Sequence, residues 1–289
     1  MSEVSDKISY INGQFLPHDK CLIHIDDRGF QFADGVYEVT LLKDGRLIDG
    51  FNHIERLFRS LKELDILHNF THQFISDIQL QLFAKNNINN GFCYLNVTRG
   101  VHSRIQNQPS AKPTINAIVT VIDDIDDQSL QPINVISHQD LRWLRCDIKS
   151  VGLCASSMIK QKALDYGASD AIMIRGGFIT EATYANIFMV DNDNNLITRA
   201  CDNLILCGIT RNRIIDIAKK NNINVIEKDF GIEELKKARE VFLTSSTLLI
   251  RPVAKIDQDL VNEGRVGNIT RDLYDFYQDF MRSYDLSCQ

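Results

Sequence analysis

A short acidic segment, residues 123–129, divides this chain into two parts whose hydrophobic patterns differ. It reads Asp-Asp-Ile-Asp-Asp-Gln-Ser and has too little apolar content to form part of a core. Before it, turn residues join short apolar runs; after it, such runs alternate with helical patterns, which is typical of α/β folds. We therefore predict a smaller α+β N-terminal domain over residues 1–122, a linker over 123–131 and a larger α/β C-terminal domain over 132–289.

The N-terminal part carries two hairpin signals. Asn12-Gly13 and Lys43-Asp44-Gly45 interrupt apolar runs with residues that favour tight turns, which predicts a strand pair at each. Asn52 and Glu55 then have the spacing of a capping box, and the apolar residues around them recur at helical intervals, which predicts a helix. The other predicted elements here are a helix over residues 74–85 and strands over 92–98 and 115–122.

The C-terminal part alternates apolar runs of strand length with longer amphipathic patterns. The predicted strands cover residues 133–137, 171–174, 186–190, 224–227 and 241–244, and the predicted helices cover 152–166, 210–221, 232–238 and 269–282.

Composition excludes several classes of protein. With 44% hydrophobic and 24% charged residues, the 289-residue chain can bury an ordinary core, which argues against disorder. Its net charge of −6 repels a phosphate backbone, so we expect no nucleic-acid partner. We find no leader and no apolar stretch of the roughly 20 residues that a spanning helix needs, so we expect a cytoplasmic protein without a membrane partner. Seven cysteines without a CxxC pair argue against a disulfide framework.

Local motifs leave the chemistry open. His68 and His72 have the spacing of a metal pair but no further ligands, so we expect no metal. Residues 207–210 precede an amphipathic run, and the backbone there either binds a phosphate or only caps a helix. The hydroxyl-rich run 244–247 allows the same two readings.

Two charged residues are similarly ambiguous. Lys149 has apolar neighbours and nearby arginines, which favour a nucleophilic amine, although most lysines are solvated surface charges. Glu181 is either a charge on an edge strand or a buried carboxylate with a cationic partner.

Three separated segments, residues 27–39, 142–150 and 205–211, stand in the order and spacing of the class IV (fold-type IV) pyridoxal-phosphate aminotransferases. The chain resembles this family over nearly its whole length, and within it resembles the D-amino-acid aminotransferases most. The resemblance implies two α/β domains, a pyridoxal 5′-phosphate cofactor and a homodimer. It also implies that the small-molecule partners are an amino acid and a 2-oxo acid.

The resemblance also implies roles for individual residues. Lys149 matches the lysine that forms a Schiff base with the cofactor and moves the substrate proton, and Glu181 matches the carboxylate that faces the pyridine nitrogen. The residues that match the phosphate-binding positions are Arg56, Ile209, Thr210, Ser245 and Ser246. Leu206 matches the residue that packs on the cofactor ring. The positions of the substrate pocket are occupied by Tyr37, Arg104, Gln106 and Tyr184.

Some of these positions depart from the family pattern. Gln106 stands where the family has a histidine, and Tyr184 and Leu248-Leu249 replace smaller or more polar residues. Transamination of a D-amino acid is the first hypothesis. Aminodeoxychorismate lyase, which releases pyruvate and 4-aminobenzoate with the same cofactor, is the alternative, followed by branched-chain or (R)-amine transamination. Tyr37-Glu38 favours the transaminase, whereas Gln106, Tyr184 and Leu248-Leu249 keep the lyase open.

Overall fold

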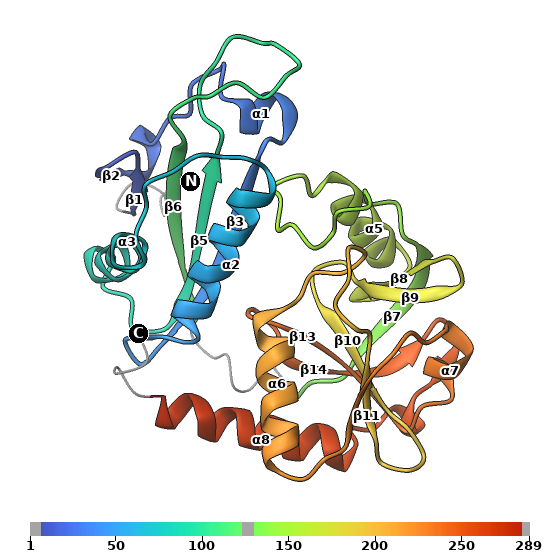
Figure 1. The fold of residues 1–289 in the computed structure, drawn as a ribbon. Coiled ribbons are helices and arrows are strands. Elements are labelled where there is room, and N and C mark those ends of the chain that lie inside the picture. Colours follow the sequence, from blue (N-terminus) through green and yellow to red (C-terminus); the bar gives the residue numbers. More distant parts are fainter. Residues whose placement is uncertain (1–6, 123–129, 285–289) are drawn as a thin grey trace. The chain divides into compact units, whose positions relative to one another are not determined.

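The computed structural model of the chain describes residues 7–122 and 130–284 (Figure 1). The acidic run of the predicted linker lies outside the described residues. The described chain divides into two compact units. The first unit comprises residues 7–122, Ile148–Gly152 and Tyr284, and the second comprises residues 130–147 and 153–283. The domain limits inferred from the sequence stay a prediction.

An antiparallel sheet with the strand order β2-β1-β6-β5-β3-β4 organises the first unit. Its strands are β1 (Ile8–Ile11), β2 (Gln14–Pro17), β3 (Gly35–Lys43), β4 (Arg46–Leu47), β5 (Gly91–Thr98) and β6 (Thr114–Val121). The helices are α1 (Arg28–Phe32), α2 (Gly50–Glu63), α3 (His72–Lys85) and a 3₁₀ turn at His18–Lys20. Helix α2 contacts β3, and α3 contacts β6 and β1 (Figure 1). Both helices bury apolar side chains in one core with the sheet.

Both predicted hairpins are confirmed. Asn12 and Gly13 adopt φ angles of 45° and 94°, the left-handed values that a tight turn between β1 and β2 requires. The predicted capping box is wrong: α2 begins at Gly50 after Asp49, and Asn52 donates to the Asp49 side chain instead (3.2 Å). Asp49 adopts a φ of 52°, so the chain enters the helix through a left-handed residue rather than through a side-chain cap.

A mixed sheet with the order β12-β11-β10-β13-β14-β7-β8-β9 forms the second unit, and β15 pairs with β14. The confirmed strands are β7 (Ile133–Gln139), β8 (Asp170–Arg175), β10 (Asn186–Val190), β12 (Val225–Glu227) and β13 (Glu240–Ser245). The sequence did not predict β9 (Phe178–Ala182), β11 (Leu196–Thr198), β14 (Leu249–Ile256) or β15 (Asp259–Leu260). The helices are α5 (Cys154–Asp165), α6 (Ile209–Lys220), α7 (Ile232–Lys236), α8 (Asn268–Ser283) and a 3₁₀ turn at Asn262–Gly264.

Cysteine usage differs from the prediction. Cys201 and Cys207 form a disulfide, which the sequence, read as lacking a disulfide framework, did not predict. Of the other described cysteines, Cys93 and Cys146 are buried and Cys154 is exposed. Burial raises the pKa of the Cys93 thiol to about 12, which keeps it protonated.

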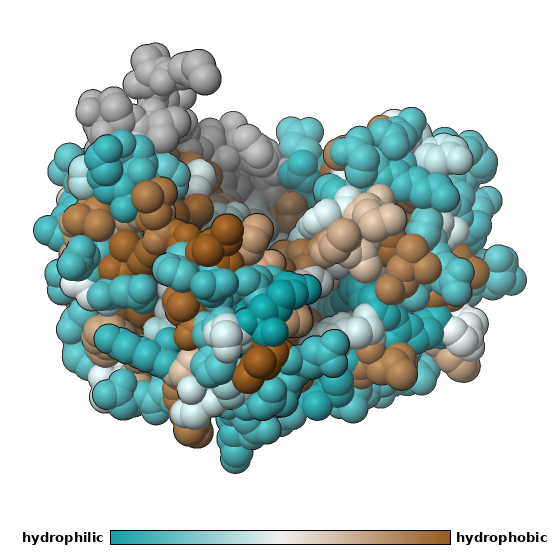
Figure 2. All heavy atoms as spheres, turned by 90° about the horizontal axis from the view of Figure 1, so that it is seen from above, coloured by the Kyte–Doolittle hydropathy of each residue, from teal (hydrophilic) through white to brown (hydrophobic). Residues whose placement is uncertain are grey.

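Hydrophobic and hydrophilic residues both occur on the surface of the molecule. Figure 2 shows small groups of hydrophobic residues among hydrophilic ones on the face that it presents. Within residues 7–122 and 130–284, no helix combines the length and the apolar character needed to cross a membrane.

Candidate active site

Lys149 packs with the first unit, because the segment Ile148–Gly152 pairs with the start of β3. The Tyr37 N–H donates to the Lys149 carbonyl (2.9 Å), and the Val151 N–H donates to the Gly35 carbonyl (3.0 Å). The Lys149 Nζ atom lies 4.3 Å from the centroid of the Tyr37 ring. None of the ion pairs found among the described residues of this unit involves that amine. The structure thus brings together two residues that the sequence placed in the site.

Arg56 belongs to a buried cluster of charged residues. From α2, its Nε and Nη2 atoms donate to the two carboxylate oxygens of Glu38 on β3, at 2.7 and 2.9 Å, and His53 Nδ1 lies 2.8 Å from the same carboxylate. All three residues are at most 9% exposed. Burial alone raises the pKa of a carboxyl, but Arg56 and His53 reverse this and hold the pKa of Glu38 well below its ordinary value. The guanidinium of Arg56 is therefore fixed by a charged carboxylate.

The loop that carries Arg104 and Gln106 is anchored through Phe32. The guanidinium carbons of Arg28 and Arg104 lie 4.5 and 4.7 Å from the centroid of the Phe32 ring. Arg28 Nη1 also donates to the Ile105 carbonyl (2.7 Å). Arg104 and Gln106 themselves are exposed. The loop therefore exposes the Arg104 guanidinium and the Gln106 amide to solvent, and its contacts with Phe32 and Arg28 restrain its position.

Glu181 lies near the end of the edge strand β9 and is only 5% exposed. Its carboxylate accepts hydrogen bonds from Asn186 Nδ2 (3.1 Å) and from the Leu206 N–H (3.1 and 3.2 Å to its two oxygens), and it pairs with Arg142 Nη1. Both sequence readings thus apply, because the residue sits on an edge strand and is also a buried carboxylate with a cationic partner. Three donors fix its orientation.

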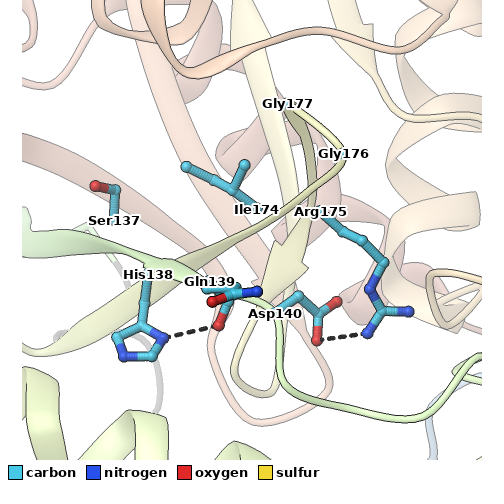
Figure 3. Close-up of a pocket in the computed structure, with 8 residues that line it drawn as sticks. All are labelled: Ser137, His138, Gln139, Asp140, Ile174, Arg175, Gly176 and Gly177. Carbon is cyan, nitrogen blue, oxygen red and sulfur yellow. Dashed lines mark hydrogen bonds and ion pairs between the residues drawn. The ribbon is translucent and has the colours of Figure 1, made fainter.

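Arg142 is in turn held by Asp140, whose side chain is fully buried. Asp140 accepts from Arg142 Nε (3.0 Å) and Nη2 (2.9 Å), from the Thr180 hydroxyl (2.9 Å) and from Arg175 (3.1 Å). Burial favours the neutral acid, but the hydrogen bonds and the charge of Arg142, together with the Thr180 hydroxyl, outweigh burial and lower the pKa of Asp140. The same acid and Arg175 line a pocket of about 450 Å³ at the ends of β7 and β8 (Figure 3). Arg142, which is near Lys149 in sequence, is thus paired with the carboxylates of Asp140 and Glu181, and Arg145 is paired with Asp147.

The segment before α6 connects Glu181 to a helix N-terminus. Leu206 donates its N–H to Glu181, and its carbonyl accepts from Asn186 (2.8 Å). Gly208 then occupies the N-cap position of α6 without a side-chain cap. A Cβ on Gly208 would lie 2.1 Å from the Asn186 Oδ1 atom, so a larger residue there would displace the Asn186 side chain from its contacts with Glu181 and Leu206. Ile209 and Thr210 follow as the first helical residues, where backbone N–H groups lack intrahelical partners.

The remaining predicted residues also lie in the second unit. Ser245 ends β13, and its hydroxyl accepts from the Leu248 N–H (3.1 Å) and lies 3.2 Å from the Thr247 hydroxyl. Ser246 follows it in the same turn and is half-buried. Tyr184 is 41% exposed, and its hydroxyl lies 2.8 Å from that of Ser157 on α5.

The predicted residues therefore fall into two groups. Lys149, Tyr37, Arg56, Arg104 and Gln106 belong to the first unit, and Glu181, Tyr184, Leu206, Ile209, Thr210, Ser245 and Ser246 belong to the second. The sequence did not reveal which residues hold these groups in place, above all Glu38, Asp140 and Asn186. The polar character of Asn186 at the start of an otherwise apolar strand was the one signal that could have revealed it.

Comparison with known proteins places the chain among aminotransferases. The model of the family described as "Amino-transferase class IV" matches residues 35–256. A D-alanine aminotransferase of Listeria monocytogenes is 38% identical over 271 residues, which are 92% of this chain and 93% of that protein. The branched-chain amino acid aminotransferase of Escherichia coli has a similar fold, with a TM-score of 0.89 at 22% identity, covering 96% of this chain and 95% of that one.

A third similar protein is a putative 4-amino-4-deoxychorismate lyase of Legionella pneumophila. Its structure gives a TM-score of 0.81 at 26% identity and covers 90% of this chain and 96% of that one. Because the family model matches well over half of the chain and the Listeria relative is similar over nearly all of it, this protein belongs to the class IV aminotransferases.

Proposed function

We propose that this chain transfers the amino group of a D-amino acid to a 2-oxo acid with pyridoxal 5′-phosphate as its cofactor. The proposal is carried by one observation: Leu206, which donates its N–H to the Glu181 carboxylate, lies in the segment that leads directly to the N-terminus of α6. This segment connects a fixed, buried carboxylate to a helix start whose N-cap is glycine. Such an arrangement suits a ligand that has a protonated ring nitrogen at one end and a phosphate at the other.

The residues of the second unit fit this cofactor. Glu181 offers an anion, held by three donors, that favours a protonated pyridine nitrogen. No side chain caps the N-terminus of α6, so the first N–H groups of this helix are suited to bind an anion. The buried Thr244 hydroxyl, next to Ser245, has no hydrogen-bond partner among the described residues. We assign the phosphate to Ile209, Thr210, Ser245 and Ser246, together with Arg56, and the ring face to Leu206.

Lys149 is the proposed base. When bound, the cofactor supplies an electron sink for the electrons that remain as the substrate loses its Cα proton. The Lys149 amine holds the cofactor and then accepts and returns that proton. Tyr37 lies against the amine and limits its position. Arg104 provides the charge for the substrate carboxylate, and Gln106 and Tyr184 shape the remainder of the pocket.

A two-substrate assay tests the function. We expect purified protein given D-alanine and 2-oxoglutarate to form pyruvate, and to form none when 2-oxoglutarate is omitted, because the nitrogen needs an acceptor. L-alanine serves as the matched control for the enantiomer. Formation of pyruvate from L-alanine but not from D-alanine would contradict the D-amino-acid assignment.

The lyase is the second candidate, favoured by the similarity to the Legionella protein and by the large Tyr184 side chain held against Ser157. The same preparation is therefore incubated with aminodeoxychorismate. Formation of 4-aminobenzoate without any 2-oxo acid would replace the transaminase by the lyase. Activity only with branched-chain amino acids or (R)-amines would favour the third candidate.

We also propose that the protein is a homodimer. Leu22, Ile25 and Phe30 are 77%, 73% and 78% exposed within one short segment of the first unit, and such apolar groups are commonly covered by a partner. We expect light scattering to give twice the chain mass of 33.0 kDa, and the double variant Leu22→Asp, Ile25→Asp to give the single mass. Leu67→Asp, at an equally exposed leucine elsewhere, is the control and should stay dimeric. A wild-type protein of single mass would refute the dimer.

A further inference from the structure

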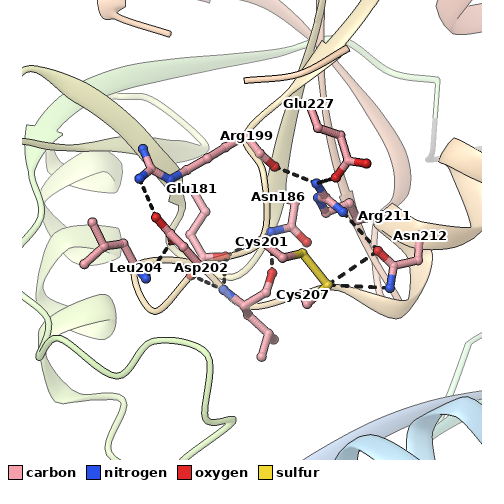
Figure 4. Close-up of a disulfide and its surroundings, with 11 residues drawn as sticks. Glu181, Asn186, Arg199, Cys201, Asp202, Leu204, Cys207, Arg211, Asn212 and Glu227 are labelled. Atoms are coloured by element: carbon pink, nitrogen blue, oxygen red, sulfur yellow. Dashed lines mark hydrogen bonds and ion pairs between the residues drawn. A yellow bond between two sulfur atoms is a disulfide. The ribbon is translucent and has the colours of Figure 1, made fainter. Parts of the chain in front are cut away.

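Cys201 and Cys207 are joined across a short loop next to the proposed cofactor site (Figure 4). They are six positions apart, and their Cα atoms are separated by 5.5 Å, within the range that a disulfide spans without backbone movement. Cys201 is exposed and Cys207 is half-buried, so small thiols can reach the pair from solvent. This accessibility distinguishes them from the buried Cys93 and Cys146.

The surroundings of Cys207 favour thiol chemistry. It directly precedes Gly208, the N-cap of α6, and the positive end of a helix stabilises a thiolate. Its sulfur also lies 3.6 Å from Asn212 Nδ2 in the first turns of the helix. Arg211 Nη1 donates to the same Asn212 side chain (3.0 Å) and orients it.

The loop closed by the two cysteines contains Leu206, one of the three donors to Glu181, and Leu204, which contacts a second donor, Arg142. Leu206 donates to the Glu181 carboxylate, and Leu204 offers its carbonyl to Arg142 (3.3 Å). Asp202 fixes the start of the loop by accepting from the Leu204 N–H (2.9 Å) and by pairing with Arg199 (2.7 Å). Figure 4 shows Glu181, Arg199, Asp202 and Leu204 around the disulfide. A bond between the loop ends therefore restrains the segment between Glu181 and α6.

We propose that Cys201 and Cys207 are a reversible thiol–disulfide modification site whose reactant is a low-molecular-weight disulfide. The Cys207 thiolate attacks one sulfur of that reactant and expels the first small thiol. The Cys201 thiolate then attacks the Cys207 sulfur and expels the second. Two protein thiols are oxidised, and the small disulfide accepts the two electrons and becomes two small thiols.

Formation of the disulfide should affect cofactor binding, and this expectation is the one part of the inference that rests on the proposed function. In the oxidised protein the segment from Cys201 to Cys207 is preorganised, so less conformational freedom is lost when a phosphate binds at α6. We expect the Kd for pyridoxal phosphate to be lower in the oxidised than in the reduced protein by about fivefold or more, which is the range of ordinary coupling between sites. We also expect amides of the loop to exchange hydrogen more slowly after oxidation.

The experiment treats the full chain with glutathione disulfide, then alkylates the remaining thiols and identifies them by peptide mass. Wild-type protein should lose two alkylatable thiols, at Cys201 and Cys207, and regain them with dithiothreitol. Cys154→Ser, which removes the exposed free cysteine on α5, should behave like wild type. Cys201→Ser should form no internal disulfide and gain at most one glutathione at Cys207. Hydrogen exchange of the loop peptide and the Kd for pyridoxal phosphate are measured on the same oxidised and reduced samples.

The outcomes separate the two proposals. Retention of both thiols in wild type, or pairing with another cysteine, overturns the modification site. A disulfide that forms without changing loop exchange or the Kd overturns the coupling to the cofactor. Formation of the disulfide in a protein that binds no pyridoxal phosphate in either state leaves the site standing and refutes the proposed function instead.

Discussion

Replacing Lys149 with alanine is expected to abolish transamination and the visible absorbance of the lysine-bound cofactor. In the proposed function the lysine holds the cofactor and moves the proton at the substrate Cα, and general acid–base catalysis alone contributes about 10²–10⁴-fold to such rates. The backbone of residue 149 pairs with β3 through its carbonyl, which the substitution keeps. The protein should therefore fold as before while losing its activity. The measurements are absorbance spectra with added pyridoxal phosphate and single-turnover rates with D-alanine.

A matched control separates chemistry from charge. Lys62 lies on α2 in the same unit and is exposed, so Lys62→Ala removes one positive charge without touching the proposed base. It should retain the absorbance and the rate of wild type. If Lys149→Ala kept the absorbance band, another amine would have to hold the cofactor, and the assignment of Lys149 would be wrong.

Local signals predicted much of the fold, because they depend on neighbouring residues. Turn residues placed both hairpins, and helical periodicity placed α3, α6 and α8 to within about two residues. Strands β9 and β11 were missed because they are short and lack a distinct alternation. The pairing of Ile148–Gly152 with β3 could not be predicted, since it joins residues more than a hundred positions apart and leaves no local pattern.

The candidate site was predictable to a different degree. Family resemblance named Lys149 and Glu181, and their roles stay predictions. Their supporting contacts were not predictable, because a hydrogen-bond partner is chosen by the tertiary fold. Arg142 illustrates this: in the sequence it is a cation near Lys149, but in the structure it pairs with Asp140 and Glu181. Burial lowers the pKa of Arg142, yet the carboxylates of Glu181 and Asp140 together outweigh burial and raise it, so Arg142 stays charged.

Of the substitutions proposed for this protein, removal of Glu38 from its buried cluster with Arg56 and His53 should lower the free energy of unfolding most. Glu38→Ala leaves Arg56 and His53 without their shared carboxylate, and removal of one partner from a buried ion pair costs about 3–5 kcal/mol of the free energy of unfolding. Hydrogen exchange at the amides of β3 and α2 measures this loss in the unit concerned. Glu55→Ala is the control, because Glu55 pairs with His72 at the surface and exposed pairs contribute about 0–1 kcal/mol.

The same cluster sets a pH dependence whose sign follows from the lowered pKa of Glu38. In the unfolded chain this carboxyl titrates near its ordinary value of 4.5, whereas in the folded protein Arg56 and His53 keep it ionised to lower pH despite its burial. Its contribution is therefore fully present above pH 4.5 and is lost as the pH falls towards the folded value. Glu38→Gln cannot titrate, so the stability difference between wild type and this variant should stay constant above pH 4.5 and shrink below it. A difference that instead grew on acidification, or a Glu38→Ala variant no less stable than Glu55→Ala, would show that Glu38 does not hold Arg56 as a charged carboxylate.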